Sequence, residues 1–252
     1  MKIPDNHPRK ESLRLRDKIV SQLGKLVTTE GLIAHGRGEA FDYIIGEKTI
    51  KAALLSEAVG ASMLKTAKKP VISVNGNTAA LVAEDIVKLS KVLDAHIEVN
   101  LFYRTEERAQ RIKEYLESFG AENVGIGQVP KIPGLTSERA KVSDEALNGD
   151  VWLVPLEDGD RTEALVKSGK SVIAIDLNPF SRTSIWATVS IVDNVVRALP
   201  NLIKFSKFVN HEKAKKLINS FDNSANLERV IGYIEQRLKK ISEEGFYEIL
   251  SR

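Results

Sequence analysis

The first quarter of the chain carries apolar residues at helical spacing, with a glycine-rich stretch in the middle. Leu13, Ile19 and Leu26 lie on one stripe of a segment spanning 11–27, and a second helical pattern covers 49–67. Between them, residues 31–39 hold three glycines within eight positions, which is typical of a loop. The pattern therefore predicts two helices joined by a flexible connection.

From residue 71 onward, short apolar runs alternate with amphipathic segments. The runs rich in β-branched residues predict strands at 71–74, 96–101, 123–126, 151–155, 171–176 and 188–192. The segments at 78–93, 105–119 and 160–168 have helical spacing, with Thr78 as the expected N-cap of the first, and 130–143 is expected to be a loop. Strands that alternate with helices and are apolar throughout predict an α/β fold with a buried, mostly parallel sheet.

The last part of the chain is expected to be helical. A helix is predicted near Asn194, with an interruption at Pro200, and an amphipathic helix covers 227–241. No linker, low-complexity segment or internal repeat divides the chain. We therefore expect a single domain over 1–252 with helical extensions at both ends, the C-terminal one from about 206 to 252.

Composition narrows the class of protein. Net charge is +3, and basic and acidic residues are mixed along the chain, so no basic stripe predicts a nucleic-acid partner. Cysteine is absent, which excludes disulfides, thiolate zinc sites and a cysteine nucleophile. No apolar run approaches the 18 residues of a membrane span, and the amino end lacks a signal sequence. We therefore expect a cytoplasmic protein without membrane partners.

Polar residues follow each predicted strand. The loops concerned are 75–77, 103–105, 157–161, 176–183 and 193–194. Helix capping explains some of them one by one, as with Asp160 and Glu163, Asn178 before Pro179, or Asp193. In a parallel sheet, however, these loops meet at one edge, where helix N-termini attract anions. Their convergence favours a binding site, and phosphates are the expected ligands.

The triplet Gly36-Arg37-Gly38 is a further candidate. Flanking glycines let the backbone approach a ligand, and an arginine can hold a phosphate through two hydrogen bonds; the alternative is a plain flexible turn. His35 beside it is either structural or catalytic. Ser168-Gly-Lys-Ser171 resembles the end of a P-loop, but it precedes a strand and Ala164 replaces the first glycine. No HExxH or carboxylate ladder predicts a metal site.

Longer strings of sequence resemble one known family. They lie at 7–9, 11–13, 30–43, 70–77, 98–105, 154–161, 172–179 and 191–194. Together they are similar to archaeal phosphopantothenate synthetases, the 4-phosphopantoate–β-alanine ligases. The agreement extends to about residue 203, and the segment after about 206 carries no matching motif.

The resemblance implies an ATP-dependent condensation of 4-phosphopantoate with β-alanine, which yields 4′-phosphopantothenate, AMP and pyrophosphate for coenzyme A synthesis. It also implies a homodimer of Rossmann-like subunits, a mostly parallel sheet flanked by helices, and an archaeal source. The nucleotide contacts that it implies fall on Arg16, Arg37, Asp176, Leu177, Asn178, Arg182, Thr183, Asn194 and Val195.

Chemistry suggests how such a reaction proceeds. A carboxylate must be activated before it forms an amide, and ATP can do this through a pantoyl adenylate. Arg37 or Arg182, together with Mg²⁺, is expected to stabilise the charge that develops on the α-phosphate. The amine of β-alanine, whose pKa is near 10, must lose a proton.

The proposed proton acceptors are Asp158, Glu157 and His35, with the acidic pair favoured. Asn75, Asn77 and Arg104 are candidates for the substrate's own phosphate. Two other functions remain open from the residues alone. One is nucleotidyl or phosphoryl transfer to another phosphorylated acid, and the other is a nucleotide sensor without catalysis.

Overall fold

The computed structural model describes residues 3–7, 9–136, 138–156 and 158–245. Its centre is a parallel sheet of six strands in the order β3-β2-β1-β6-β7-β8. The strands are β1 (Pro70–Val74), β2 (His96–Val99), β3 (Val124–Gly125), β6 (Val151–Pro155), β7 (Ser171–Ile175) and β8 (Val189–Ile191). The α/β fold with a mostly parallel sheet is therefore confirmed.

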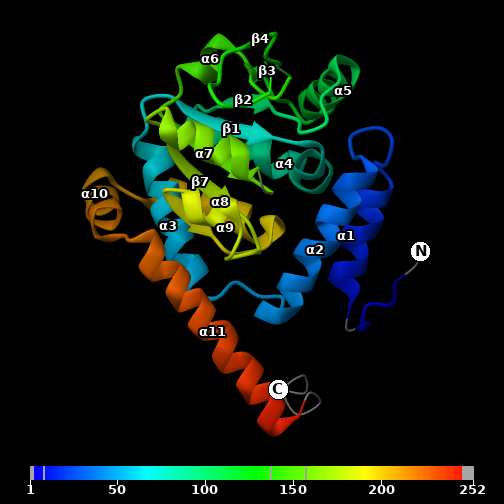
Figure 1. Cartoon of the computed structure of the whole chain (residues 1–252), viewed down its shortest axis with the longest axis vertical. Helices are drawn as coiled ribbons and strands as arrows, with labels where there is room; N and C mark the ends of the chain where they lie inside the picture. The colour runs from blue at the N-terminus through cyan, green and yellow to red at the C-terminus, as the bar shows by residue number, and fades with distance from the viewer. Residues whose placement is uncertain (1–2, 8, 137, 157, 246–252) are drawn as a thin grey trace.

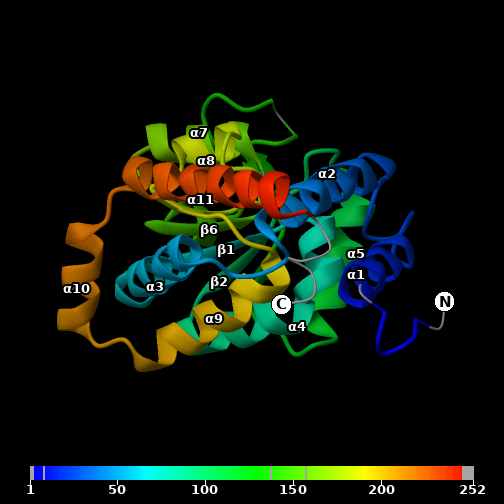
Figure 2. The same cartoon turned by 90° about the horizontal axis from the view of Figure 1, so that it is seen from below.

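Helices cover both faces of this sheet. Those on one face are α3 (Lys51–Thr66), α4 (Gly76–Leu93), α5 (Glu106–Glu117) and α9 (Val195–Phe208). The other face is covered by α6 (Asp144–Leu147), α7 (Gly159–Lys167) and α8 (Arg182–Trp186). Figures 1 and 2 show the resulting layers, with α3, α4 and α9 opposite α7 and α8.

Alternation along the strands explains why both faces are apolar. In β1, Ile72 and Val74 belong to the larger core, whereas Val71 belongs to the smaller core under α7. In β6, Leu153 and Trp152 divide in the same way. Successive side chains of a strand point to opposite faces, so a strand that is apolar at every position must be buried on both sides.

The strand order creates a switch point at the centre of the sheet. From β1 the chain moves outward to β2 and β3, then returns to β6 on the other side of β1 and continues to β7 and β8. The connections diverge between β1 and β6, and ligands of such sheets bind in the crevice outside the carboxyl ends there. Asn75, Asp158 and Asn194 each cap a helix at this edge.

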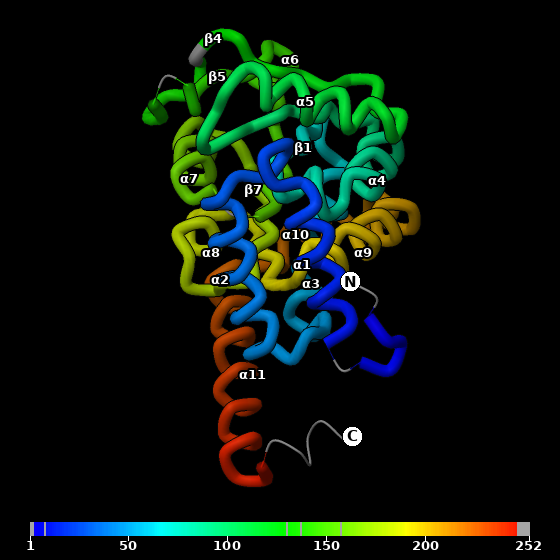
Figure 3. Tube along the Cα trace, turned by 90° about the vertical axis from the view of Figure 1, so that its right-hand side faces the viewer, coloured from blue at the N-terminus to red at the C-terminus, as the bar shows by residue number. Residues whose placement is uncertain are grey.

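The prediction of a glycine-rich loop at 31–39 is wrong. Helix α2 (Thr29–Ile45) runs through it, and the Thr28 side chain caps its N-terminus by accepting from Gly31 N. Packing explains at least one of the glycines, because a Cβ on Gly31 would lie 2.6 Å from Asn77 Oδ1. The preceding helix, α1 (Lys10–Val20), lies beside α2 and ends earlier than the apolar stripe predicted (Figure 3).

Several caps also differ from the prediction. Asn75 caps α4 in place of Thr78, Asp158 caps α7 in place of Asp160, and Ser181 caps α8 in place of Asn178. Each true cap is a residue with extended or irregular backbone whose side-chain oxygen reaches a first-turn N–H. Sequence alone does not select one member of a run of Asn, Asp, Ser or Thr.

The C-terminal helices pack on the body instead of forming a loose tail. Pro200 lies in the second turn of α9 and does not end the helix, so the predicted interruption is wrong. Helix α10 (His211–Ser220) packs against α3, and α11 (Asn223–Glu244) begins against α3 and β8 and then projects outward (Figures 1 and 3). Asn226 near its start donates to Ala52 O and Ser56 Oγ.

The segment expected to be a loop at 130–143 contains a small hairpin. Strands β4 (Val129–Pro130) and β5 (Lys141–Val142) pair antiparallel at one end of the molecule. Among the described helices, none combines the length and the apolar character that a membrane span requires.

Candidate functional site

Two adjoining cavities lie at the carboxyl edge of the sheet. The larger measures about 520 Å³ and lies among the loops after β1, β2 and β6. The smaller measures about 140 Å³ and lies between α1, α2 and the loops after β7 and β8. Residues lining both are Ala34, Arg37, Asn77, Leu156 and Asn178. The cavities therefore meet at one junction, which brings together residues from the loops after β1, β6 and β7 and from α2.

The smaller cavity collects most of the expected nucleotide contacts. Asp176, Leu177 and Asn178 line it directly after β7, and Asn194 lines it after β8. Asp176 accepts hydrogen bonds from Asn178 N at 3.0 Å and from Ser181 Oγ at 2.5 Å. These two hydrogen bonds stabilise the conformation of the loop after β7. The predicted convergence of these two strand ends is present.

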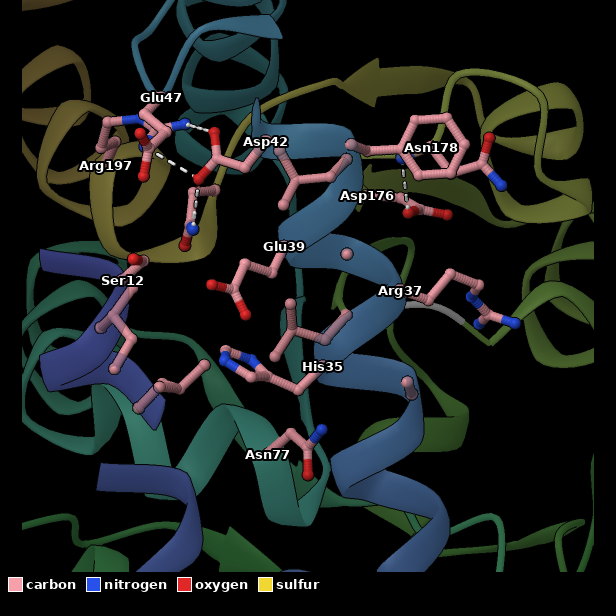
Figure 4. Close-up of a pocket in the computed structure, with 18 of the residues that line it drawn as sticks. Ser12, His35, Arg37, Glu39, Asp42, Glu47, Asn77, Asp176, Asn178 and Arg197 are labelled. Atoms are coloured by element: carbon pink, nitrogen blue, oxygen red, sulfur yellow. Dashed lines mark hydrogen bonds and ion pairs between the residues drawn. The ribbon is translucent and has the colours of Figure 1, made fainter. Parts of the chain in front are cut away.

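Helix α2 presents His35 and Arg37 to different sides. Figure 4 shows His35 and Glu39 on the side of α2 that faces Ser12 and Asn77, while Arg37 extends from the opposite side, where Asp176 and Asn178 also lie. Two residues apart on a helix means a rotation of about 200°. A glycine-rich loop would have allowed both side chains to reach one ligand atom, and the helix does not.

His35 is uncharged at neutral pH. Burial lowers its pKa, and the nearby charge of Glu39 only partly opposes this shift. Its Nε2 is buried and has no hydrogen-bond partner within the described part of the chain. His35 therefore lines the smaller cavity as a neutral imidazole.

Arg16 reaches the site through Glu39. Its Nε donates to Glu39 Oε2 at 2.7 Å, and Tyr43 donates to the other carboxylate oxygen. Burial raises the pKa of Glu39, but these hydrogen bonds outweigh burial, and the pKa falls below its ordinary value. Glu39 lines the smaller cavity and Arg16 does not, so the half-exposed Arg16 side chain is connected to the cavity through Glu39.

The larger cavity contains the N-terminus of α4. The Asn75 side chain caps this helix by accepting from Thr78 N and donates to Leu156 O, and Asn77 donates to Gly31 O at 2.8 Å. A Cβ on Gly76 would lie 2.0 Å from Leu26 O, so only glycine fits at this point. This turn is therefore packed closely against the segment that joins α1 and α2.

The cation beside that turn is Arg108, not the predicted Arg104. Arg108 lines the larger cavity, and its guanidinium lies 2.8 Å from where a Cβ on Gly76 would be. Arg104 does not line either cavity; its buried side chain donates to Gly127 O at 2.6 Å. Arg108 lies on α5, one helical turn after the predicted position, and the helical pattern there concealed it.

Asp158 is held in an ionic network. It caps α7, and its oxygens accept from Arg139 at 2.5 Å and from the fully buried Arg161. Arg139 also bonds Asp160, which in turn accepts from Arg182. Asp158, Asp160 and Arg182 line the larger cavity, whereas Glu157 lies outside the described residues.

Thr183 and Val195 are buried within the first turns of α8 and α9, and neither side chain lines a cavity. Of the expected nucleotide set, these two and Arg16 do not line either cavity. Each nevertheless stands next to a residue that lines a cavity or is bonded to one.

Sequence reasoning missed a buried network behind the smaller cavity. Asp42 on α2 accepts from Asn194 Nδ2 at 2.8 Å and from Arg197 at 2.5 Å, and Arg197 also bonds Asp193. Deeper still, Glu57 on α3 lies next to Asp193, and burial together with that charge raises the pKa of Glu57 to about 9. The sequence signal that could have revealed this network is the pair Asp42 and Glu57, two acidic residues on helix faces that are otherwise buried.

The fold and its paired cavities define a doubly wound parallel α/β protein with a polar cleft at the switch point. Residues 52–237 match the sequence model of the family described as phosphopantothenate/pantothenate synthetase. The chain therefore belongs to this family, and the resemblance found in its sequence is confirmed.

Curated relatives agree with the family assignment. Over 252 residues the chain is 47% identical to the 4-phosphopantoate–β-alanine ligase of Thermococcus kodakarensis, and the matched region covers 97% of each of the two chains. It is 47% identical over 251 residues to the protein of the same name from Methanosarcina mazei, with 97% of this chain and 99% of the relative covered. The relative from Methanospirillum hungatei is 45% identical over 241 residues, or 95% of this chain and 99% of its own.

Proposed function

We propose that this protein is an ATP-dependent 4-phosphopantoate–β-alanine ligase. It joins the two substrates as an amide and releases 4′-phosphopantothenate, AMP and pyrophosphate, a step toward coenzyme A. The observation that carries the proposal is the pair of cavities that meet at Arg37 and Asn178, in a chain 47% identical to ligases of that name. A reaction between a nucleotide and a phosphorylated acid needs two adjoining sites for anions, held in register.

ATP is proposed to occupy the smaller cavity and to extend its phosphates toward the junction. Leu177 offers an apolar contact there, and Asn178 and Asn194 offer polar ones. The carboxylate of the phosphorylated acid attacks the α-phosphate, which forms a pantoyl adenylate and expels pyrophosphate. Arg37 and Arg182 stabilise the negative charge of that transition state. Support comes from the position of Arg37 at the wall of both cavities.

Mg²⁺ is proposed to accompany the nucleotide. The described residues contain no group of three or more His, Cys, Asp or Glu arranged to hold a metal. This suits an ion that takes most of its ligands from phosphate oxygens and water, with one carboxylate from the protein. Asp176, at the wall of the smaller cavity, is the proposed carboxylate, and the bound ion would neutralise phosphate charge.

The substrate's own phosphate is proposed to bind at the N-terminus of α4. Asn75, Gly76 and Asn77 lie there, and Arg108 supplies the positive charge expected earlier from Arg104. An anion at a helix N-terminus is stabilised by free backbone N–H groups and the helix dipole. Arg104 is proposed instead to hold the β3–β4 connection through Gly127.

Asp158 is proposed to receive the proton of the β-alanine ammonium. It lines the larger cavity with Arg37 and Asn178, whereas His35 faces the other side of α2. Asp158 Oδ1 accepts from Arg139 and from Arg161 N, whereas Oδ2 accepts from Arg161 Nε at 3.4 Å and keeps a lone pair for the proton. His35, neutral and without a partner for Nε2 among the described residues, is the alternative acceptor.

The protein is further proposed to be a homodimer that buries the projecting part of α11. Ile231 and Leu238 are exposed on this helix and lie seven residues apart, so they share one face. An apolar face on a helix that projects into solvent suits association with a second copy.

One assay tests the proposed reaction. The purified protein is incubated with ATP and Mg²⁺, and nucleotide products are separated. AMP is expected only when 4-phosphopantoate and β-alanine are both present. ADP as product would favour phosphoryl transfer instead, and ATP binding without any product would favour a nucleotide sensor.

A further inference from the structure

The floor of the larger cavity holds a buried carboxamide that lacks a partner on one side. Asn100 follows β2 and is 4% exposed; its Nδ2 donates to Ser73 Oγ on the neighbouring strand β1 at 3.0 Å. Both residues line the cavity. Asn100 Oδ1 accepts no hydrogen bond from any described residue. A strong acceptor thus lies unused at the wall of a binding site.

Two other buried polar residues of the described chain, Glu98 and Asn226, differ in one of these respects. Glu98 is fully buried on the same strand, but its oxygens accept from Ser143 N at 2.9 Å and Ser143 Oγ at 2.6 Å. Asn226 also has an unpartnered Oδ1, yet it lines neither cavity. Asn100 combines an unpartnered oxygen with a side chain that lines the larger cavity, so the cavity is where a ligand group can supply the remaining partner.

The position of Asn100 indicates which ligand group is concerned. Its backbone N donates to Val74 O, the last residue before the turn at Asn75 and Gly76 where the substrate phosphate is proposed to bind. 4-Phosphopantoate carries one free hydroxyl, on the carbon between its carboxylate and the carbon that bears the methyl groups. That hydroxyl lies a few bonds from the phosphate, and it is the only donor on the trianion, in which the carboxylate and the phosphate are both fully ionised.

We propose that Asn100 Oδ1 accepts a hydrogen bond from the free hydroxyl of the phosphorylated acid, with Ser73 holding the carboxamide in place. Asn100 is thereby a specificity-determining residue that distinguishes a 2-hydroxy acid from the same acid without the hydroxyl. This assignment rests on the proposed function. A site built around a buried polar group discriminates against a ligand that cannot pair with it, because the group is then left desolvated and unpaired.

The test compares two substrates in four proteins. The substrates are 4-phosphopantoate and its 2-deoxy analogue, and the proteins are the wild type, Asn100→Leu, Asn100→Asp and the control Asn226→Leu. The kcat/KM for AMP release is measured for each pair at saturating ATP and β-alanine. The wild type is expected to prefer the hydroxy acid by on the order of 10- to 100-fold.

The ratio of the two substrates isolates the hydrogen bond, since changes in folding or overall charge affect both alike. Asn100→Leu should reduce the preference to within a few-fold, Asn100→Asp should keep it because an oxygen still accepts, and Asn226→Leu should keep it. A preference that survives in Asn100→Leu, or that vanishes in Asn100→Asp, overturns the assignment. A change confined to the KM of β-alanine also overturns it. A wild type without AMP release on 4-phosphopantoate refutes the proposed function itself.

Discussion

At the scale of single residues, the junction of the two cavities is formed by side chains that line both of them. Arg37 lines both, and its neighbours Asp176 and Asn178 come from the loop after β7 (Figure 4). An arginine holds phosphate oxygens through two hydrogen bonds in a fixed fork, which a lysine cannot reproduce.

Arg37→Lys is expected to lower kcat/KM for ATP by on the order of 10- to 100-fold, the loss that one charge-assisted hydrogen bond implies. Steady-state AMP release at varied ATP measures it. Arg111→Lys is the matched control, because Arg111 pairs with Glu107 on α5 and lines neither cavity. Unchanged kinetics in Arg37→Lys would remove this residue from the mechanism.

Asp158→Asn is expected to impair amide formation more than adenylate formation. Asparagine is as good a helix cap as aspartate, so α7 keeps its N-cap while the acceptor of the proton is lost. Exchange of labelled pyrophosphate into ATP reports the first step, and phosphopantothenate release reports both. An equal fall in the two rates would contradict the assignment to the second step. Asp160→Asn, which alters the same arginine network, serves as the control.

Glu57→Gln is expected to flatten the pH dependence of stability. The folded pKa of Glu57 lies above its unfolded value of 4.5, so between these values the native state binds the extra proton. Stability therefore falls as pH rises through this window, by up to about 1.4 kcal/mol per pH unit. Denaturant unfolding of both proteins at pH 5 to 8 measures the difference. Parallel profiles, like those expected for the exposed Glu228→Gln, would refute a protonated Glu57.

At the scale of elements, α2 lines both cavities and contributes residues to the junction between them. It carries Gly31, Gly36 and Gly38, and its continuity is the main departure of the structure from the sequence pattern. The glycines differ in their surroundings. A Cβ on Gly31 meets Asn77, one on Gly38 meets Leu177 at 3.7 Å, and one on Gly36 meets nothing within 4 Å.

Gly36→Ala is therefore expected to stabilise the protein by about 0.5–1 kcal/mol, because alanine loses less backbone entropy in a helix. For a chain of this size that corresponds to roughly 1–4 °C in Tm by thermal denaturation. Gly31→Ala, on the same helix, should instead lower Tm. A lower Tm for Gly36→Ala would mean that this position leaves the helix in solution.

At the scale of the whole molecule, residues 1–252 are proposed to form one domain. The C-terminal helices complete its core: Leu227, Val230 and Ile234 of α11 pack with Ile45 of α2 and Ala53 of α3. The helical extension expected after about residue 206 thus packs against α2 and α3 as part of the core, and the end of α11 is the part proposed to contact a second copy.

Leu238→Glu is expected to convert the proposed dimer into a monomer, since a charge on the apolar face of α11 opposes its burial. Light scattering after size exclusion gives the mass directly. Lys239→Glu, on a solvated position of the same helix, should leave the dimer intact. A monomeric wild type at micromolar concentration would refute the proposed assembly.

The sequence by itself determined the parallel α/β fold, the positions of the strands and the polar loops that follow them. Uniformly apolar strands require burial on both faces of the sheet. Parallel strands bring the loops that follow them to one edge of the sheet, whatever the order of the strands. The same reasoning supplied Asp176, Asn178 and Asn194, which do line one cavity.

Only the tertiary structure decided the rest, because it depends on contacts between distant segments. The glycine-rich stretch is helical and lies close to Asn77, and the helix turns His35 and Arg37 apart. Leu26 O lies against Gly76 and accepts a hydrogen bond from Arg108, which places Arg108 at the N-terminus of α4. Arg104 instead donates to Gly127 O. A local pattern carries no information about which distant group satisfies a buried charge, and that choice places the cations of this site.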